Sequence, residues 1–63
     1  DMPPLAYLRL CRLHRVRTAL KEADPQNITV TTIAMRYGFL HLGRFAREYR
    51  HLFNEIPSKT LAS

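Results

Sequence analysis

The sequence predicts an all-α fold in which one long helix is followed by two short helices joined by a tight turn. Apolar residues recur at steps of three and four along residues 5–23, 30–37 and 41–53, which is the period of an amphipathic helix. Gly38 interrupts this pattern between the second and third segments, and no segment shows the alternation typical of a strand. The two short helices with their glycine turn predict a helix-turn-helix over residues 30–53.

The first predicted helix, residues 5–23, carries one broad apolar arc. Its members are Leu5, Leu8, Leu13, Val16, Ala19, Leu20 and Ala23. Two charged residues, Arg9 and Arg12, fall inside the arc, and the apolar Tyr7 and Leu10 fall outside it. A helix that is apolar on more than one side should be covered there by another part of the protein. Because the chain begins without an initiator methionine, we expect it to be a piece of a longer protein whose upstream part supplies that cover.

Proline, glycine and small polar residues set the predicted ends of the helices. Pro25 ends the first helix, because the residue before a proline disfavours the helical conformation. Thr29 is expected to cap the second helix, and Gly38 to close it in the left-handed conformation. Asn54 can replace glycine at the exit of the third helix, and residues 57–61 are predicted to add one short helical turn.

The third helix has an inner apolar face, formed by Leu42, Phe45, Tyr49, Leu52 and Phe53. The period of its aromatic residues matches that of a buried face, so we interpret them as core rather than as a platform for stacking bases. Together with the long first helix, the second and third helices would form a homeodomain-like three-helix bundle.

The charge of the chain favours a polyanionic partner. Ten Lys and Arg residues stand against five acids, which gives a net charge of +5 and an isoelectric point near 10.2. Most of the basic residues are arginine, whose planar fork matches phosphate and the edge of guanine better than lysine does. The alternative is a solvated basic surface that only keeps the protein soluble.

Several other classes of function find no support in the sequence. Cys11 is the only cysteine, so neither an internal disulfide nor a zinc finger can form, and we expect a buried, inert thiol. His14, His41 and His51 have no recognised metal-ligand spacing, and we predict no metal or cofactor. No apolar run approaches the ~20 residues of a membrane span. No catalytic motif is present, so we predict that the protein is not an enzyme.

Several segments of the chain follow the pattern of one known family. They are Ile33-Ala34-Met35-Arg36-Tyr37-Gly38-Phe39, Phe45-Ala46-Arg47 and Phe53-Asn54-Glu55-Ile56-Pro57, with Tyr7-Leu8 and Arg12-Leu13 upstream. In these segments the chain resembles the AraC/XylS family of bacterial transcription regulators, whose DNA-binding region has two helix-turn-helix units joined by a long helix. The resemblance implies that residues 1–63 are one subdomain, in which residues 5–23 are the connecting helix and residues 30–53 the second unit. The chain departs from the family at Asn54, which replaces a glycine, and at Thr60-Leu61, where the family commonly has Tyr-Arg.

The resemblance implies sequence-specific binding of double-stranded promoter DNA in the cytoplasm, at the nucleoid. The third helix would enter the major groove, and the candidate base contacts are Leu42, Gly43, Arg44 and Arg47. Of these, Leu42 is divided between core and contact with a thymine methyl. The candidate phosphate contacts are Thr31, Arg36, Arg50 and His51.

Other interpretations of the same residues stay open. Arg44 and Glu48 are spaced to form a surface ion pair that needs no DNA, and Arg15 and Arg17 are expected to be solvated. The basic helix could instead contact another protein, such as RNA polymerase, and the chain could self-associate through its first helix. Binding to a membrane surface is a further alternative, which the globular pattern disfavours.

Overall fold

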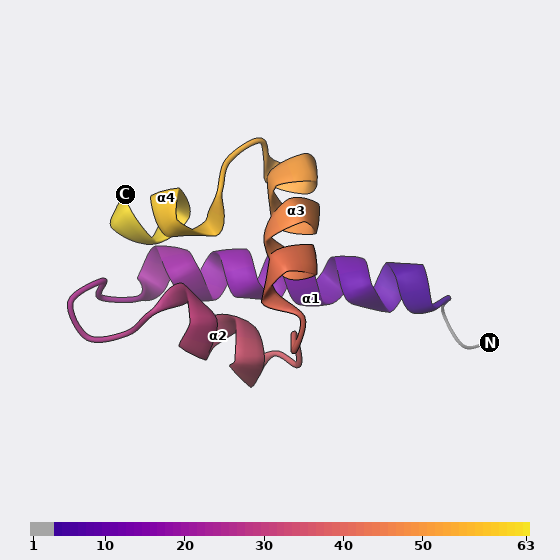
Figure 1. The fold of residues 1–63 in the computed structure, drawn as a ribbon, viewed down its shortest axis with the longest axis horizontal. Helices are drawn as coiled ribbons and strands as arrows, with labels where there is room; N and C mark the ends of the chain where they lie inside the picture. The colour runs from indigo at the N-terminus through magenta and orange to yellow at the C-terminus, as the bar shows by residue number, and fades with distance from the viewer. Residues whose placement is uncertain (1–3) are drawn as a thin grey trace.

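The three shorter helices of the protein pack against one half of its long first helix. The computed structural model describes residues 4–63, which form four α-helices and no strand: α1 (Leu5–Glu22), α2 (Val30–Arg36), α3 (Leu42–Phe53) and α4 (Pro57–Ala62). In Figure 1, α1 runs along the length of the molecule, α3 crosses it steeply, and α2 and α4 lie on either side of its C-terminal half. The N-terminal turns of α1 project beyond the others, so the molecule measures 41 × 21 × 19 Å. The all-α fold with a helix-turn-helix is confirmed.

The helix ends follow the local signals of the sequence to within one residue. Thr29 caps α2, because its hydroxyl oxygen accepts a hydrogen bond of 3.1 Å from the amide of Thr32. Gly38 has φ of 90° and turns the chain out of α2. Asn54 ends α3 in the left-handed conformation, with φ of 59° and ψ of 25°. Differences are small. α1 ends at Glu22 rather than at residue 23, and α2 at Arg36 rather than at residue 37. α3 begins at Leu42 rather than at residue 41, and α4 reaches Ala62 rather than residue 61.

The core lies where the four helices meet on the C-terminal half of α1. Its buried apolar residues are Leu13, Val16, Leu20, Ile33, Ala34, Phe39, Phe45, Tyr49 and Leu61. Three successive aromatic pairs run through it, with ring centroids 5.0 Å apart for Phe39 and Phe45, 5.8 Å for Phe45 and Tyr49, and 4.6 Å for Tyr49 and Phe53. The predicted aromatic stripe of α3 is therefore part of the core. Burying one such side chain contributes about 1.5–3 kcal/mol to stability.

The apolar arc of α1 is buried along only part of its length. Leu5 and Leu8, whose cover was expected to come from an upstream part of the protein, are exposed here, because α2 and α4 reach only the C-terminal half of that helix. The predicted inner face of α3 is wrong at two positions. On α3, Leu42 and Leu52 are 36% and 37% exposed although they belong to the predicted inner face. Both lie near the ends of the helix, beyond the aromatic side chains that meet α1, and so they reach only the margin of the core.

A buried polar cluster joins α3 to α4. The hydroxyl of Tyr49 donates a hydrogen bond of 2.7 Å to the hydroxyl oxygen of Thr60, and Thr60 in turn donates to the carboxylate of Glu55. Burial raises the pKa of Tyr49 above its ordinary value, although the hydrogen bond with Thr60 acts in the opposite direction. Thr60 is therefore a packing residue in this chain. None of the helices in residues 4–63 is long and apolar enough to cross a membrane.

Candidate nucleic-acid interface

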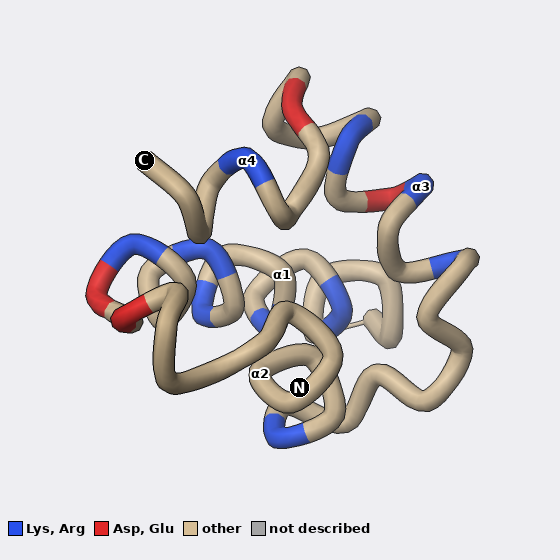
Figure 2. The backbone as a smooth tube through the Cα atoms, turned by 60° about the vertical axis from the view of Figure 1, so that its left-hand side comes forward, with Lys and Arg blue, Asp and Glu red and all other residues tan. Residues whose placement is uncertain are grey.

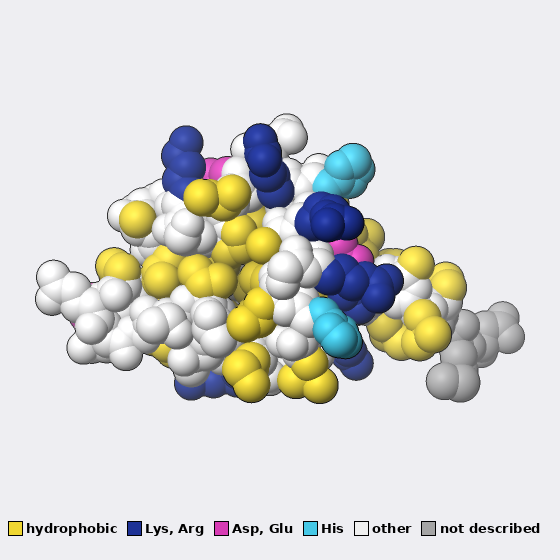
Figure 3. Space-filling view, viewed as in Figure 1, with side chains coloured by type: hydrophobic (Ala, Val, Ile, Leu, Met, Phe, Trp, Pro, Cys, Tyr) yellow, Lys and Arg dark blue, Asp and Glu magenta, His cyan; other side chains and the backbone are white. Residues whose placement is uncertain are grey.

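The outer face of α3 gathers basic side chains along one strip of surface. The core residues Phe45 and Tyr49 turn one side of this helix inward, which leaves Arg44, Arg47 and His51 on the opposite side. All three are exposed, as is the neighbouring Arg50. Figure 3 shows dark blue and cyan side chains following α3. The structure therefore brings together most of the sequence-predicted site residues on a single convex helix.

Acidic residues are few along this strip. In Figure 2, Lys and Arg occur on every helix, whereas the acids lie around the end of α1, on α3 and just after α3. Glu48 is the one acid within α3 itself. Apart from Glu48, the strip exposes basic side chains and part of the polypeptide backbone of α3. Both suit contact with the phosphates of a nucleic acid.

Gly43 gives the strip a place where the helix backbone is bare. A Cβ atom added at this position would meet no heavy atom within 4 Å, so the site is open rather than crowded. Gly43 lies one helical turn before Arg47, on the same side of α3. A flat partner could therefore approach the helix axis more closely here than at either neighbouring turn.

Leu42 lies apart from the other candidate base contacts. The five-residue separation between Leu42 and Arg47 corresponds to about 140° around the helix axis. The Leu42 side chain lines a shallow groove with Thr31 and Ala46, between α3, the start of α2 and the start of α4. Leu42 thus packs only in part, along this groove, and 36% of it is exposed.

The four candidate phosphate contacts also fall into two groups. Arg50 and His51 line an open hollow on the outer side of α3 together with Arg47. Thr31 is exposed on the flank of α2 that adjoins α3. Arg36 is exposed too, but it lies about 140° around the α2 axis from Thr31, on the other flank. The structure therefore brings Arg50 and His51 to the strip, whereas Thr31 lines the groove beside Leu42 and Arg36 lies on the other flank of α2.

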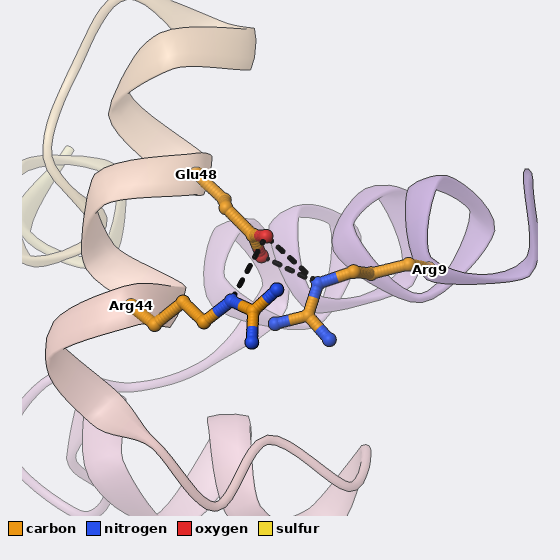
Figure 4. Close-up of polar contacts among 3 residues, drawn as sticks. All are labelled: Arg9, Arg44 and Glu48. Atoms are coloured by element: carbon orange, nitrogen blue, oxygen red, sulfur yellow. Dashed lines mark hydrogen bonds and ion pairs between the residues drawn. The ribbon is translucent and has the colours of Figure 1, made fainter. Parts of the chain in front are cut away.

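Glu48 is bound by two arginines from different helices. The Nε atom of Arg9, on α1, lies 2.6 and 2.9 Å from the two carboxylate oxygens, whereas the Nε atom of Arg44 lies 3.7 Å from the nearer one. Figure 4 shows the Nε atoms of both arginines directed at the carboxylate, with Arg9 reaching it from α1 and Arg44 from α3. The ion pair predicted between Arg44 and Glu48 is present, but it is the longer of the two contacts, and the Arg44 side chain is 68% exposed.

Sequence reasoning missed two arginine contacts on α1. Arg9 places its guanidinium 5.4 Å from the centre of the Phe39 ring while it binds Glu48. Its position inside the apolar arc was the signal. Arg17 was expected to be solvated, but it is half-buried, with its guanidinium 4.9 Å from the centre of the Phe53 ring. Cys11 is half-buried rather than buried, and the described residues hold no cluster of potential metal ligands.

Comparison with known proteins extends this description. The model of a family described as a helix-turn-helix domain matches residues 1–63. The chain is 46% identical over 59 residues to XylDLEGF operon transcriptional activator 2 of Pseudomonas putida, covering 94% of this chain and 38% of that protein. It is 47% identical over 58 residues to the probable thc operon regulatory protein of Rhodococcus erythropolis, covering 92% of this chain and 18% of that protein. The chain thus spans less than two fifths of these relatives, and no solved structure matches it.

Proposed function

Because the chain belongs to the AraC/XylS family of helix-turn-helix transcription regulators, we propose that it binds double-stranded DNA with α3 in the major groove. The observation that carries this proposal is the strip along α3, where Arg44, Arg47 and His51 face outward on a helix held from behind by the aromatic core. A major groove about 12 Å wide admits one helix. The proposal places this protein with the bacterial chromosome, in the cytoplasm.

Arg44 and Arg47 are the proposed readers of base edges. Each can donate two hydrogen bonds to the O6 and N7 atoms of a guanine, which is worth about 1–3 kcal/mol of discrimination against the wrong base. Gly43 would let the helix backbone approach the floor of the groove. Leu42 would contribute through its exposed part, which could contact a thymine methyl at the border of the interface.

The proposed phosphate contacts would fix the register of α3 on the duplex. Arg50 and His51 border the hollow on its outer side, and Thr31 offers a hydroxyl from the adjoining flank of α2. Arg36 would reach a phosphate only where the DNA backbone passes the other flank of α2. Such contacts are independent of sequence, and their number sets how steeply the affinity falls with salt.

Selection from a random duplex library, followed by fluorescence anisotropy at several salt concentrations, tests this function. We expect one enriched sequence, an affinity that falls steeply between 50 and 200 mM salt as phosphate contacts require, and a loss of about tenfold or more for Arg44→Ala or Arg47→Ala. Arg15→Ala removes an exposed arginine of α1 outside the strip and is the control for net charge. The proposal would be overturned if the protein bound scrambled DNA as tightly as the selected sequence. It would also be overturned if both variants of α3 bound the selected DNA as tightly as the unaltered protein.

An alternative function is contact with another protein. Leu5, Tyr7, Leu8 and Leu10 are exposed on the projecting half of α1, which favours self-association through that helix. Contact with RNA polymerase rests on the basic strip alone. Sedimentation equilibrium at increasing concentration tests the first, with a Leu5→Ser and Leu8→Ser double variant as the control, and a monomer at every concentration would exclude it.

A further inference from the structure

Glu48 is a disadvantage in a surface that binds DNA. It lies one helical turn beyond Arg44 and directly after Arg47, so its carboxylate borders the side of α3 that would face phosphates. An unpaired carboxylate there would repel the DNA backbone. It would also compete with a base edge for the guanidinium of Arg44, since residues at this spacing attract one another on a helix surface.

Arg9 binds this carboxylate from α1. The Nε atom of Arg9 lies within 3 Å of both carboxylate oxygens, and the side chain of Glu48 is 29% exposed against 68% for Arg44. The guanidinium of Arg9 is itself steadied by the face of the Phe39 ring, 5.4 Å away. Two residues 39 positions apart in the sequence thus form the closer pair, and the local pair on α3 stays loose.

We propose that Arg9 is a positioning residue for base readout, which neutralises Glu48 and thereby leaves Arg44 free to bind DNA. This inference rests on the proposed function of α3. Arg9 acts through Glu48 and need not touch the duplex. The connecting helix therefore helps to decide how the helix-turn-helix reads its site, and the side chain responsible comes from outside the helix-turn-helix itself.

Binding measurements on a cycle of variants test this role. In Arg9→Met, which keeps an apolar stem against Phe39, Glu48 is left to Arg44, and we expect affinity for the selected DNA to fall about three- to tenfold. Discrimination at the base pair read by Arg44 should fall as well. Adding Glu48→Gln to Arg9→Met should restore both, because the competing charge is gone. Arg9→Lys should keep most of the affinity, since it retains the neutralising charge.

The rescue separates this role from two others. If Arg9 contacts DNA directly, or if it only ties α1 to α3, then Glu48→Gln cannot restore binding to Arg9→Met. Thermal unfolding of each variant reports the loss of the tie between the helices. In an Arg44→Ala background, Arg9→Met should have little further effect on base discrimination. Arg15→Met is the matched control, because this exposed arginine of the same helix does not line the hollow that Arg9 shares with Arg44 and Glu48.

The outcomes distinguish the inference from the function on which it rests. If the unaltered protein binds no DNA, the proposed function fails and the inference fails with it. If it binds DNA and Arg9→Met binds equally well, or the double variant stays impaired, only the inference is overturned. If Arg9→Met fails to fold, Glu48→Gln alone still decides, because we expect it to bind DNA at least as tightly as the unaltered protein, and weaker binding would contradict the proposed competition.

Discussion

The Tyr49 hydroxyl on α3 donates a 2.7 Å hydrogen bond to Thr60 on α4, between two side chains that are 0% and 2% exposed. The Thr60 hydroxyl in turn donates a hydrogen bond to the carboxylate of Glu55. The short last helix is therefore bound to the inner side of the helix that carries the basic strip. The orientation of that strip relative to α1 therefore depends on a residue near the C-terminal end of the chain.

Removing the Thr60 hydroxyl and removing the Tyr49 hydroxyl should lower the free energy of unfolding by different amounts. Thr60→Val keeps the shape of the side chain but leaves the Tyr49 hydroxyl buried without a partner, and we expect a loss of about 1–3 kcal/mol in the free energy of unfolding. Tyr49→Phe removes the donor and leaves Thr60 bound to Glu55, so the expected loss is smaller, about 0.5–1.5 kcal/mol. Urea denaturation measures both. A Tyr49→Phe variant less stable than Thr60→Val would contradict the proposed order.

The buried Tyr49 also predicts a loss of stability at alkaline pH. Burial raises the pKa of this hydroxyl, so in the unfolded chain it ionises near pH 10 while in the folded protein it keeps its proton. Above that pH the unfolded state binds fewer protons than the folded state, and the free energy of unfolding falls as pH rises. Below it, the group makes no difference to the pH dependence.

Denaturant titrations between pH 9 and pH 11 measure this effect, as the range brackets the ordinary ionisation of tyrosine. The unaltered protein should lose stability more steeply over that range than Tyr49→Phe does. Every other residue is common to both proteins, so the difference between the two curves isolates Tyr49. Parallel curves would show that this hydroxyl ionises equally well in the folded protein.

Short-range features of this fold follow from sequence, and long-range contacts do not. Thr29, Gly38 and Asn54 each act on backbone within a few residues, so local rules placed the helix ends to within one residue. The contact between Arg9 and Glu48 instead requires α1 and α3 to cross at those two turns, and no periodicity encodes where two helices cross. The same holds for the exposed start of α1, because an apolar arc does not specify what covers it.

In the candidate site, too, some features could be predicted from the sequence and others could not. The basic outer face of α3 could be predicted, because the spacing of Phe45 and Tyr49 fixes which side of the helix turns inward. That Thr31 lines a groove beside α3 while Arg36 lies on the other flank of α2 could not be predicted, since this depends on which flank of the short α2 packs beside α3. Direct tests of these residues therefore distinguish positions that look equivalent in the sequence.

Thr29 and Thr31 provide one such pair of positions. Thr29→Ala removes the cap of α2 and should cost about 1 kcal/mol in the free energy of unfolding. Thr31→Ala alters an exposed residue in the first turn of the same helix and should leave stability within about 0.5 kcal/mol. DNA binding should show the opposite order once both proteins are folded, because only Thr31 lines the groove beside Leu42 on α3. Equal effects of both variants in both assays would refute this assignment.

The two glycines form a second pair with opposite consequences. At Gly38, φ is 90°, and an added Cβ would lie 3.7 Å from a guanidinium nitrogen of Arg12, which is an ordinary contact. The expected cost of Gly38→Ala therefore comes from backbone strain, about 1–2 kcal/mol, rather than from crowding. DNA affinity of the folded fraction should change little.

Gly43→Ala should instead separate stability from DNA binding. The position is helical and an added methyl meets nothing within 4 Å, so alanine should stabilise the protein by roughly 0.5–1 kcal/mol through its higher helix propensity. If the backbone of α3 approaches the bases at this turn, the same methyl occupies space that DNA needs, and affinity should fall while the melting temperature rises. Anisotropy and thermal unfolding on one preparation measure both quantities. A variant that is more stable and binds DNA as tightly as the unaltered protein would place Gly43 outside the interface and move the close approach of the helix to another turn.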